Sequence, residues 1–231
     1  MRRTIVVATY NVHGAVGIDR RYAPERIARV INEIDADIVA LQELQSKPDF
    51  ALPEYLAGET GCRAIAGPTM NNAGGEFGNG LLVRFPSAST THINLAFERR
   101  EPRAAIDTTL DIDGHPLRVI ATHLGLIPRE RRTQVGTLLE SIRSDRTTRT
   151  ILLGDLNEWF LRGRALRSLH EHFGESPARA TYPSVLPLFA LDRIWCSPAA
   201  MLVSVRAHRS RTARVASDHL PLVAEIRWDA A

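Results

Sequence analysis

The sequence predicts an α/β protein in which mixed or antiparallel sheets are covered by helices. Short apolar runs typical of strands outnumber amphipathic segments, with about eleven strands against three clear helices. A doubly wound parallel sheet needs a helix for nearly every strand, so this ratio favours layered sheets. No repeat, low-complexity tract or shift in composition marks a linker. We therefore expect a layered α/β sandwich that forms a single domain over residues 1–231.

The first half of the chain reads mainly as strands. Residues 4–12 form the first apolar run, and residues 38–41 the second. Between them, residues 24–34 begin with a proline and repeat apolar residues every three or four positions, as a helix does. Four glycines in residues 74–80 indicate either a phosphate-binding loop or, as we prefer, a flexible approach to a strand. The further strands expected here are 81–85, 89–95, 104–112 and 117–122, the last two joined at the turn signal Asp113-Gly114.

The second half contains the two other clear helices. Residues 128–143 place Val135, Leu138, Leu139 and Ile142 on one face. Residues 164–173 form the next helix, which Gly174 ends. The strands expected here are 150–154, 191–196, 202–207 and 222–228.

Composition excludes several classes of protein. The 231 residues are 44% hydrophobic and 24% charged, which is ordinary for a globular chain and unlike a disordered or fibrous one. Cys62 and Cys196 are too few and too far apart for a disulfide framework or a cysteine-rich zinc site. No apolar stretch approaches the roughly 20 residues of a membrane span, and no signal peptide is evident. We expect a cytoplasmic monomer.

Arginine dominates the basic residues. All but Lys47 of the 29 basic residues are arginine, although the net charge is only +3. Arginine binds phosphate through a rigid fork, so a phosphate-bearing partner is one explanation, and genomic codon bias is the other. The arginines of residues 99–103, 129–132 and 206–214 form either an anion-binding rim or a solvated surface. The candidate substrate-binding residues are Asn79, Arg103, Arg211 and Arg214.

Polar side chains gather where the apolar runs end. Each of them has a structural alternative, such as a turn residue, a helix cap or a core histidine. Together, carboxylates and amides are hard oxygen ligands suited to Mg²⁺ or Mn²⁺, while histidines can move protons or stabilise phosphoryl charge. No GxSxG, Walker A or HExxH motif is present, so hydrolysis by an activated water is favoured. The residues concerned are Asn11, Glu43, His123, Asp155, Asn157, Asp192, Asp218 and His219.

The order of these motifs resembles the endonuclease/exonuclease/phosphatase superfamily, the deoxyribonuclease I-like phosphohydrolases. Gly-Asp-Leu-Asn at 154–157 and Ser-Asp-His-Leu-Pro at 217–221 are its most specific elements, together with Leu-Gln-Glu at 41–43. The likeness spans residues 4–228. It implies a four-layer sandwich, with two mixed sheets face to face, helices outside and a metal site at one edge.

The resemblance also implies a role for each site residue. Glu43 would be the principal Mg²⁺ ligand, assisted by Asn11 and Asp218. Asp155 would orient or deprotonate the attacking water, and Asn157 would hold it or a phosphate oxygen. His219 would stabilise the transition state with its tautomer fixed by Asp192. His123 would bind a phosphate oxygen or assist the leaving group.

The expected function is Mg²⁺-dependent hydrolysis of phosphoesters, as a phosphodiesterase, nuclease or phosphatase, with Mn²⁺ as an alternative ion. The expected partner is a phosphate-containing substrate: a nucleic acid, a phospholipid head group or a small phosphoester. The chain is close to the bare fold in length, which disfavours a large duplex-specific nuclease. The alternative is a module on the same fold that binds nucleic acid or anionic phospholipid without catalysis.

Overall fold

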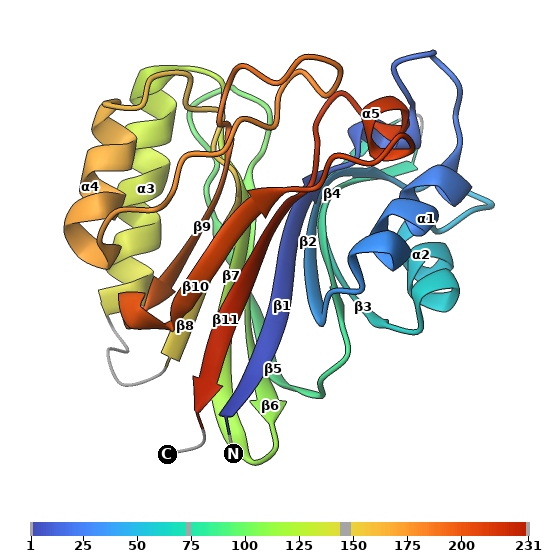
Figure 1. Ribbon diagram of the computed structural model, residues 1–231. Helices are drawn as coiled ribbons and strands as arrows, with labels where there is room; N and C mark the ends of the chain where they lie inside the picture. Colours follow the sequence, from blue (N-terminus) through green and yellow to red (C-terminus); the bar gives the residue numbers. More distant parts are fainter. Residues whose placement is uncertain (1, 73–74, 144–148, 230–231) are drawn as a thin grey trace.

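The computed structural model describes residues 2–72, 75–143 and 149–229 of the chain. Within these residues, eleven strands form two mixed sheets that pack face to face, and helices cover both outer faces (Figure 1). The α/β class and the four-layer arrangement predicted from the sequence are thus confirmed.

One sheet has six strands. They are β1 (Arg2–Asn11), β2 (Ile38–Gln45), β3 (Arg63–Asn72), β4 (Gly75–Val83), β10 (Leu202–Ala207) and β11 (Leu222–Asp229). The spatial order is β10-β11-β1-β2-β4-β3. β1 and β2 run parallel, with Val7 opposite Ile38, and the other neighbouring pairs are antiparallel.

The other sheet has five strands. They are β5 (Ser87–Asn94), β6 (Ala104–Ile112), β7 (His115–His123), β8 (Arg149–Asp155) and β9 (Asp192–Ser197), in that spatial order. Only β7 and β8 run parallel, with Val119 opposite Ile151. Each sheet therefore contains one parallel pair.

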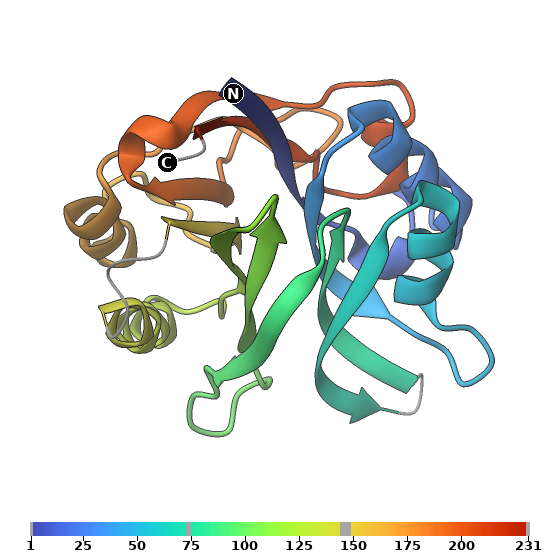
Figure 2. The ribbon, with the colours of Figure 1, turned by 90° about the horizontal axis from the view of Figure 1, so that it is seen from below.

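Helices form the two outer layers, as seen from below in Figure 2. α1 (Pro24–Ile34), α2 (Leu52–Thr60) and α5 (Ala213–Ala216) cover the six-stranded sheet. α3 (Pro128–Arg143) and α4 (Arg164–Phe173) cover the five-stranded sheet. Two short 3-10 turns, η1 (His13–Ala15) and η2 (Ala199–Met201), complete the elements.

The core lies in three layers because the inner strands are buried on both faces. In β1, Ile5 and Val7 face the other sheet, whereas Ala8 and Tyr10 face the helices. Side chains of a strand alternate between faces, so burial of both faces requires an unbroken apolar run. This explains the continuous apolar runs of the sequence.

Three elements depart from the sequence prediction. Residues 52–60 form α2, residues 63–72 form β3, and residues 213–216 form α5. The glycine-rich residues were expected to be a flexible approach, but β4 begins at Gly75; Gly74 lies outside the described residues. None of the helices in the described part of the chain has the length and apolar character that crossing a membrane requires.

Candidate active site

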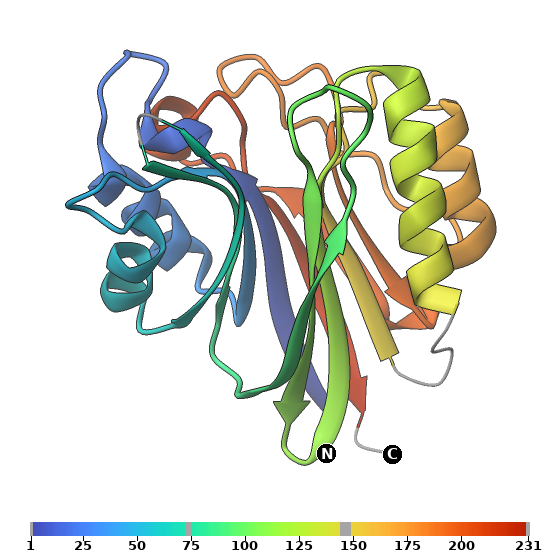
Figure 3. The ribbon, with the colours of Figure 1, turned by 180° about the vertical axis from the view of Figure 1, so that it is seen from behind.

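Four of the expected site residues lie at the ends of the two parallel strand pairs. Asn11 ends β1, Glu43 lies near the end of β2, His123 ends β7 and Asp155 ends β8. Asn11 Nδ2 donates hydrogen bonds to Glu43 Oε1 at 2.9 Å and to Asp155 Oδ2 at 3.1 Å. The edge that carries them is opposite the chain termini (Figure 3). The bond between Asn11 and Asp155 therefore joins the two sheets at this edge.

The Gly-Asp-Leu-Asn segment positions its acid through a close approach of β7 and β8. Gly154 has a φ of 151°, and a Cβ at this position would clash with the carbonyl oxygen of Thr122. Glycine is therefore required for Asp155 to lie where it does. The Asp155 side chain is fully buried, and its Oδ1 accepts a hydrogen bond from the backbone N–H of Asn157 at 2.9 Å.

Glu43 lies on an irregular part of β2. The pairing of β2 with β4 shifts register between Leu41 and Leu44, and Glu43 has a φ of 56°, uncommon for a residue other than glycine. Burial raises the pKa of the Glu43 carboxyl. The charges of Asp218 and Asp155 raise this pKa further, while the Asn11 hydrogen bond lowers it. The site thus holds repelling carboxylates that a divalent cation would stabilise.

His123 is held from two sides in the buried part of the site. Its Nδ1 lies 2.9 Å from Nη1 of Arg103, and its Nε2 lies 3.0 Å from Nδ2 of Asn157. A neutral imidazole has one accepting nitrogen, and a guanidinium can only donate. Asn157 Nδ2 is a donor as well, because it also donates to the Leu124 carbonyl, so a neutral His123 can accept from only one of its two neighbours. The charged guanidinium is the stronger donor, and we therefore assign Nδ1 as the acceptor from Arg103. Nε2 then carries the proton, 3.6 Å from Asp155 Oδ2, and its approach to Asn157 Nδ2 is a contact without a hydrogen bond. Burial, together with the charges of Arg103 and His219, lowers the pKa of His123 to about 3, although Asp155 opposes the shift.

His219 has the opposite environment. Its Nδ1 lies 2.9 Å from Asp192 Oδ2, which also accepts a hydrogen bond from the Thr181 hydroxyl at 2.6 Å. Its Nε2 lies 3.7 Å from Asp155 Oδ2. Burial lowers the pKa of His219, but Asp192, Asp155 and Asp218 outweigh this effect and raise it to about 10. In the metal-free site these charges favour the imidazolium form of His219, next to a His123 whose neutral form is favoured.

The segment before β11 connects His219 to the first sheet. The Ser217 hydroxyl donates to the backbone carbonyl of Asn11 at 2.7 Å, and Ser184 N–H donates to the Asp218 carbonyl at 2.7 Å. These bonds fix the half-buried Asp218 beside β1. Its charge acts on both Glu43 and His219.

The donor set fits a divalent cation. In the described part of the chain, ligand atoms of the buried Asp155, Asp192 and His219 lie within 4.8 Å of one another, close enough to hold a metal. Asp192 Oδ2, however, already accepts hydrogen bonds from His219 Nδ1 and from the Thr181 hydroxyl. The less enclosed Glu43 and Asp218 supply the hard oxygens that Mg²⁺ prefers. The carboxylates around Asp155 therefore suit an ion on the Glu43 side and an anion on the His219 side.

The expected substrate-binding residues lie in different settings. Arg103 is buried between His123 and Glu101, whose Oε1 is 3.1 Å from its Nη2. Arg214 donates to the carbonyl of Val185 at 3.0 Å, and Arg211 is exposed on the segment between β10 and α5. Arg131, in a segment considered for the rim, is buried against Glu158.

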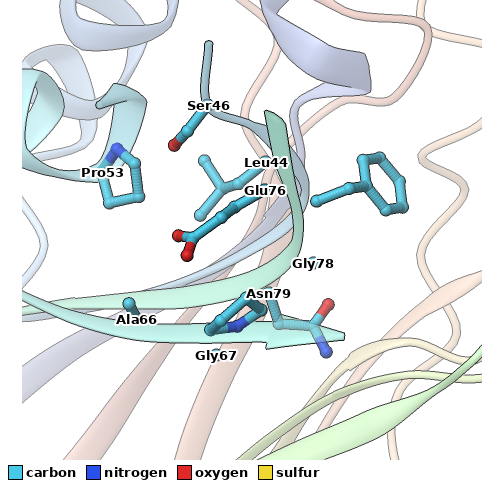
Figure 4. A pocket seen from close by; sticks show the side chains of 10 residues that line it. Leu44, Ser46, Pro53, Ala66, Gly67, Glu76, Gly78 and Asn79 are labelled. Atoms are coloured by element: carbon cyan, nitrogen blue, oxygen red, sulfur yellow. The ribbon is translucent and has the colours of Figure 1, made fainter. Parts of the chain in front are cut away.

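Asn79 joins the two sheets beside a small pocket. Its Nδ2 donates to the carbonyl of Ala104 at 2.9 Å. The pocket, of about 20 Å³, is lined by residues of β2, β3, β4 and α2 (Figure 4). Figure 4 shows the side chains of Glu76 and Asn79 pointing in different directions. The pocket has room for about one water molecule, so it is not the substrate site.

Two functional contacts escaped the sequence interpretation. Thr181 holds Asp192, and the only sequence signal was its place shortly before that residue. Arg103 contacts His123 rather than solvent. The register of the predicted hairpin could have indicated this contact. Ala105 pairs with Thr122 across the Asp113-Gly114 turn, and residues just before Ala105 therefore lie beside His123, which follows Thr122.

Comparison with known proteins defines the class to which this fold and site correspond. A model of the endonuclease/exonuclease/phosphatase family matches residues 8–219. The chain therefore belongs to this family, whose members are generally metal-dependent phosphoester hydrolases. A search of curated proteins found no match.

Solved structures of low sequence identity share the fold. An endonuclease/exonuclease/phosphatase of Beutenbergia cavernae is similar with a TM-score of 0.80 and 21% identity over 99% of this chain and 72% of that one. The human Nocturnin catalytic domain, with a bound sulfate anion, is similar with a TM-score of 0.73 and 19% identity, over 97% of this chain and 96% of that one. A mannosyl-6-phosphatase of Bacteroides thetaiotaomicron is similar with a TM-score of 0.74 and 18% identity, over 95% of this chain and 98% of that one.

Proposed function

We propose that this protein is a Mg²⁺-dependent hydrolase of phosphoester bonds. The observation that carries the proposal is the position of Asp155, whose Oδ2 lies 3.1 Å from Asn11 Nδ2, 3.6 Å from His123 Nε2 and 3.7 Å from His219 Nε2. One buried carboxylate thus borders the acidic side of the site and both histidines. Attack of water on a phosphoester needs these groups together: a cation site, an acceptor for a proton and donors for phosphoryl oxygens.

Glu43 would hold the ion, with Asp218 and Asn11 beside it. When bound, Mg²⁺ would neutralise charge on phosphoryl oxygens. The raised pKa of Glu43, caused by its burial and by the neighbouring carboxylates, supports a cation here. Asn11 Oδ1 accepts from the backbone N–H of His13 at 3.1 Å, so its amide orients the carboxylates through Nδ2.

The other residues act on the water and the phosphate. Asp155 accepts a proton from water and is fixed for this by Asn157 N–H. The His219 imidazolium donates to a phosphoryl oxygen, and Asp192 keeps it charged and oriented. His123 donates from Nε2 to a phosphate oxygen or to the leaving group, while Asn157 Nδ2, bonded to the Leu124 carbonyl at 2.9 Å, limits its movement.

The first experiment measures hydrolysis of bis-p-nitrophenyl phosphate and p-nitrophenyl phosphate with Mg²⁺, Mn²⁺ or EDTA. We expect metal-dependent release of nitrophenol that EDTA abolishes and that Asp155→Ala lowers by at least about 100-fold. Preference between the two esters decides between a phosphodiesterase and a phosphatase. Glu140→Gln is the matched control, because Glu140 is an exposed acid on α3.

Turnover in EDTA, or in Asp155→Ala at the rate of the unchanged protein, would contradict these roles. A protein that binds Mg²⁺ and oligonucleotides or anionic phospholipid without cleaving any phosphoester would instead be the binding module. The complete set of acids and histidines favours the enzyme.

A further inference from the structure

Among the described residues, several large apolar side chains are exposed to solvent at the edge of the sheets where the candidate active site lies. We call this surface the apolar rim: the exposed apolar side chains of residues 159–161 and 185–189. Phe160 is 71% exposed, Leu186 66% and Leu188 64%. Exposed apolar side chains gathered in this way mark interaction surfaces in soluble proteins.

The two segments of the apolar rim are built together. The Trp159 ring packs against Phe189 with a centroid distance of 4.8 Å and against Tyr182 at 5.7 Å. Tyr182 in turn contacts His219, with ring centroids 4.9 Å apart. The loops that carry the rim lie above the sheets, at the edge opposite the termini (Figure 1). The apolar rim therefore borders the candidate active site.

The segment 182–189 is held in place by backbone and side-chain hydrogen bonds. Leu188 N–H donates to the Tyr182 carbonyl at 2.8 Å, and the Ser184 hydroxyl donates to the Ser217 carbonyl at 2.7 Å. Arg214 donates to the Val185 carbonyl at 3.0 Å. Fixed hydrogen bonds keep the apolar side chains exposed, although burying them would be favourable.

Arginines border the apolar rim. Phe160 shares a cavity of about 320 Å³ with Arg132 and Arg164, and the acid that lines it, Glu158, is paired with Arg131. Leu161 shares a groove of about 800 Å³ with Arg162 and Arg167, and with one acid, Glu175. In each hollow the arginines outnumber the acid. Apolar side chains flanked by cations match an anionic phospholipid surface. The acyl region of such a surface accepts the apolar side chains, and its anionic head groups pair with the arginines.

We propose that the apolar rim docks the protein on an anionic phospholipid surface and so presents the active site to phosphoesters there. Single-stranded nucleic acid fits less well. Most side chains of the apolar rim are leucine or valine, which do not stack on bases, and the rings of Trp159 and Phe189 pack edge to face against each other. Phe160 is then one exposed ring, whereas a single-stranded site presents several. That the docked protein hydrolyses phosphoesters of this surface rests on the proposed function, whereas docking itself does not.

The test is flotation of the 231-residue chain with phosphatidylcholine vesicles, with or without phosphatidylglycerol, in EDTA. We expect binding to the vesicles that contain phosphatidylglycerol. Trp159 should report it by a blue shift of its emission, because Trp195 and Trp228 are buried already. The triple change Phe160→Ser/Leu186→Ser/Leu188→Ser should weaken binding by about tenfold or more. Val203→Ser, an exposed apolar residue of β10, is the control and should bind as the unchanged protein does.

Several results would overturn docking. The first is that the protein does not bind vesicles, and the second is that a triple variant with an unchanged thermal midpoint binds them as well as the unchanged protein does. The third is that the protein binds oligonucleotides and not vesicles. The fourth is that the protein associates with itself and the triple change removes this self-association. Asp155→Ala should still bind vesicles. Loss of hydrolysis and loss of docking are thereby separated.

Discussion

Two histidines of the candidate site have neighbours that favour opposite protonation states, and each has its Nε2 within 3.7 Å of the same carboxylate, Asp155. His123 faces the Arg103 guanidinium and His219 faces Asp192. A cationic neighbour in a buried site disfavours an imidazolium, and an anionic neighbour favours it. One ring can therefore donate as a neutral group while the other contributes a fixed positive charge.

The protonation states can be tested by imidazole ¹⁵N NMR of the metal-free protein from pH 5 to pH 9. His123, with a pKa of about 3, should stay neutral with its proton on Nε2, and His219, with a pKa of about 10, should stay doubly protonated. When the titration is extended down to about pH 2, Arg103→Gln should show a raised pKa of His123, because a charge that lowers it is lost. The same change should slow ester hydrolysis by roughly tenfold or more.

Arg103→Lys is the matched control, since it keeps the charge and shortens the donor. It should leave the pKa of His123 low. A His123 pKa that is identical in the Gln variant and the unchanged protein would contradict the role given to Arg103. Stability follows the same signs: the His219 contribution is complete below about pH 6.5 and is lost as the pH rises through about 10.

At the scale of elements, one buried ion pair fixes the segment between β8 and α4. Arg131 on α3 lies 3.3 Å from Glu158, and its Nη1 also donates to the Leu126 carbonyl at 2.6 Å. Glu158 Oε1 accepts from the backbone N–H of Phe160 at 3.2 Å. The pair thus shapes a loop that follows β8 and carries part of the apolar rim.

Breaking this pair should destabilise the protein strongly. Arg131→Met leaves the Glu158 carboxylate buried without its partner, so we expect a loss of about 3–5 kcal/mol in the free energy of unfolding. Urea denaturation measures it. The double change Arg131→Met/Glu158→Leu should recover most of the loss, because no uncompensated charge remains. A double variant as unstable as the single one would show that the hydrogen bond to Leu126 dominates.

The sequence predicted the elements with a regular apolar pattern. α1, α3, α4, β6 and β10 have the expected bounds, and in the three helices and β6 the buried face repeats with the period of a helix or a strand. α2 has only nine residues and a weak pattern, and β3 is an edge strand that contains Gly67 and Pro68. Such segments gain their structure from the sheet and the helices beside them.

Site prediction from sequence had a similar limit. Asn11, Glu43, His123 and Asp155 were predicted because strand ends and motifs mark them, and the structure places them at one edge of the sheets. The partner of a side chain depends on direction and pairing across the fold, which apolar patterns do not encode. Arg103 was thus expected at the surface, yet it lies buried against His123.

At the scale of the whole molecule, the negative charge of Glu43 opposes folding, and we propose that a bound cation offsets this cost. The Glu43 carboxyl has a raised pKa because of its burial and the charges of Asp218 and Asp155. An acid whose pKa is higher in the folded state binds its proton more tightly there. Its ionisation therefore costs stability as the pH rises above the value for the unfolded chain. A bound cation would reverse this cost at neutral pH.

Thermal unfolding with and without Mg²⁺ tests this balance. At a Mg²⁺ concentration about 100 times the dissociation constant, binding adds about 2.7 kcal/mol, which raises the midpoint of a chain of this size by about 5–10 °C. Glu43→Gln should raise the midpoint of the metal-free protein, since a repelling charge is gone, and should remove most of the Mg²⁺ effect. Glu140→Gln should leave both values unchanged. If Glu43→Gln lowered the metal-free midpoint and kept the full Mg²⁺ shift, the ion would bind elsewhere, and the buried group of Asp155, Asp192 and His219 would become the better candidate.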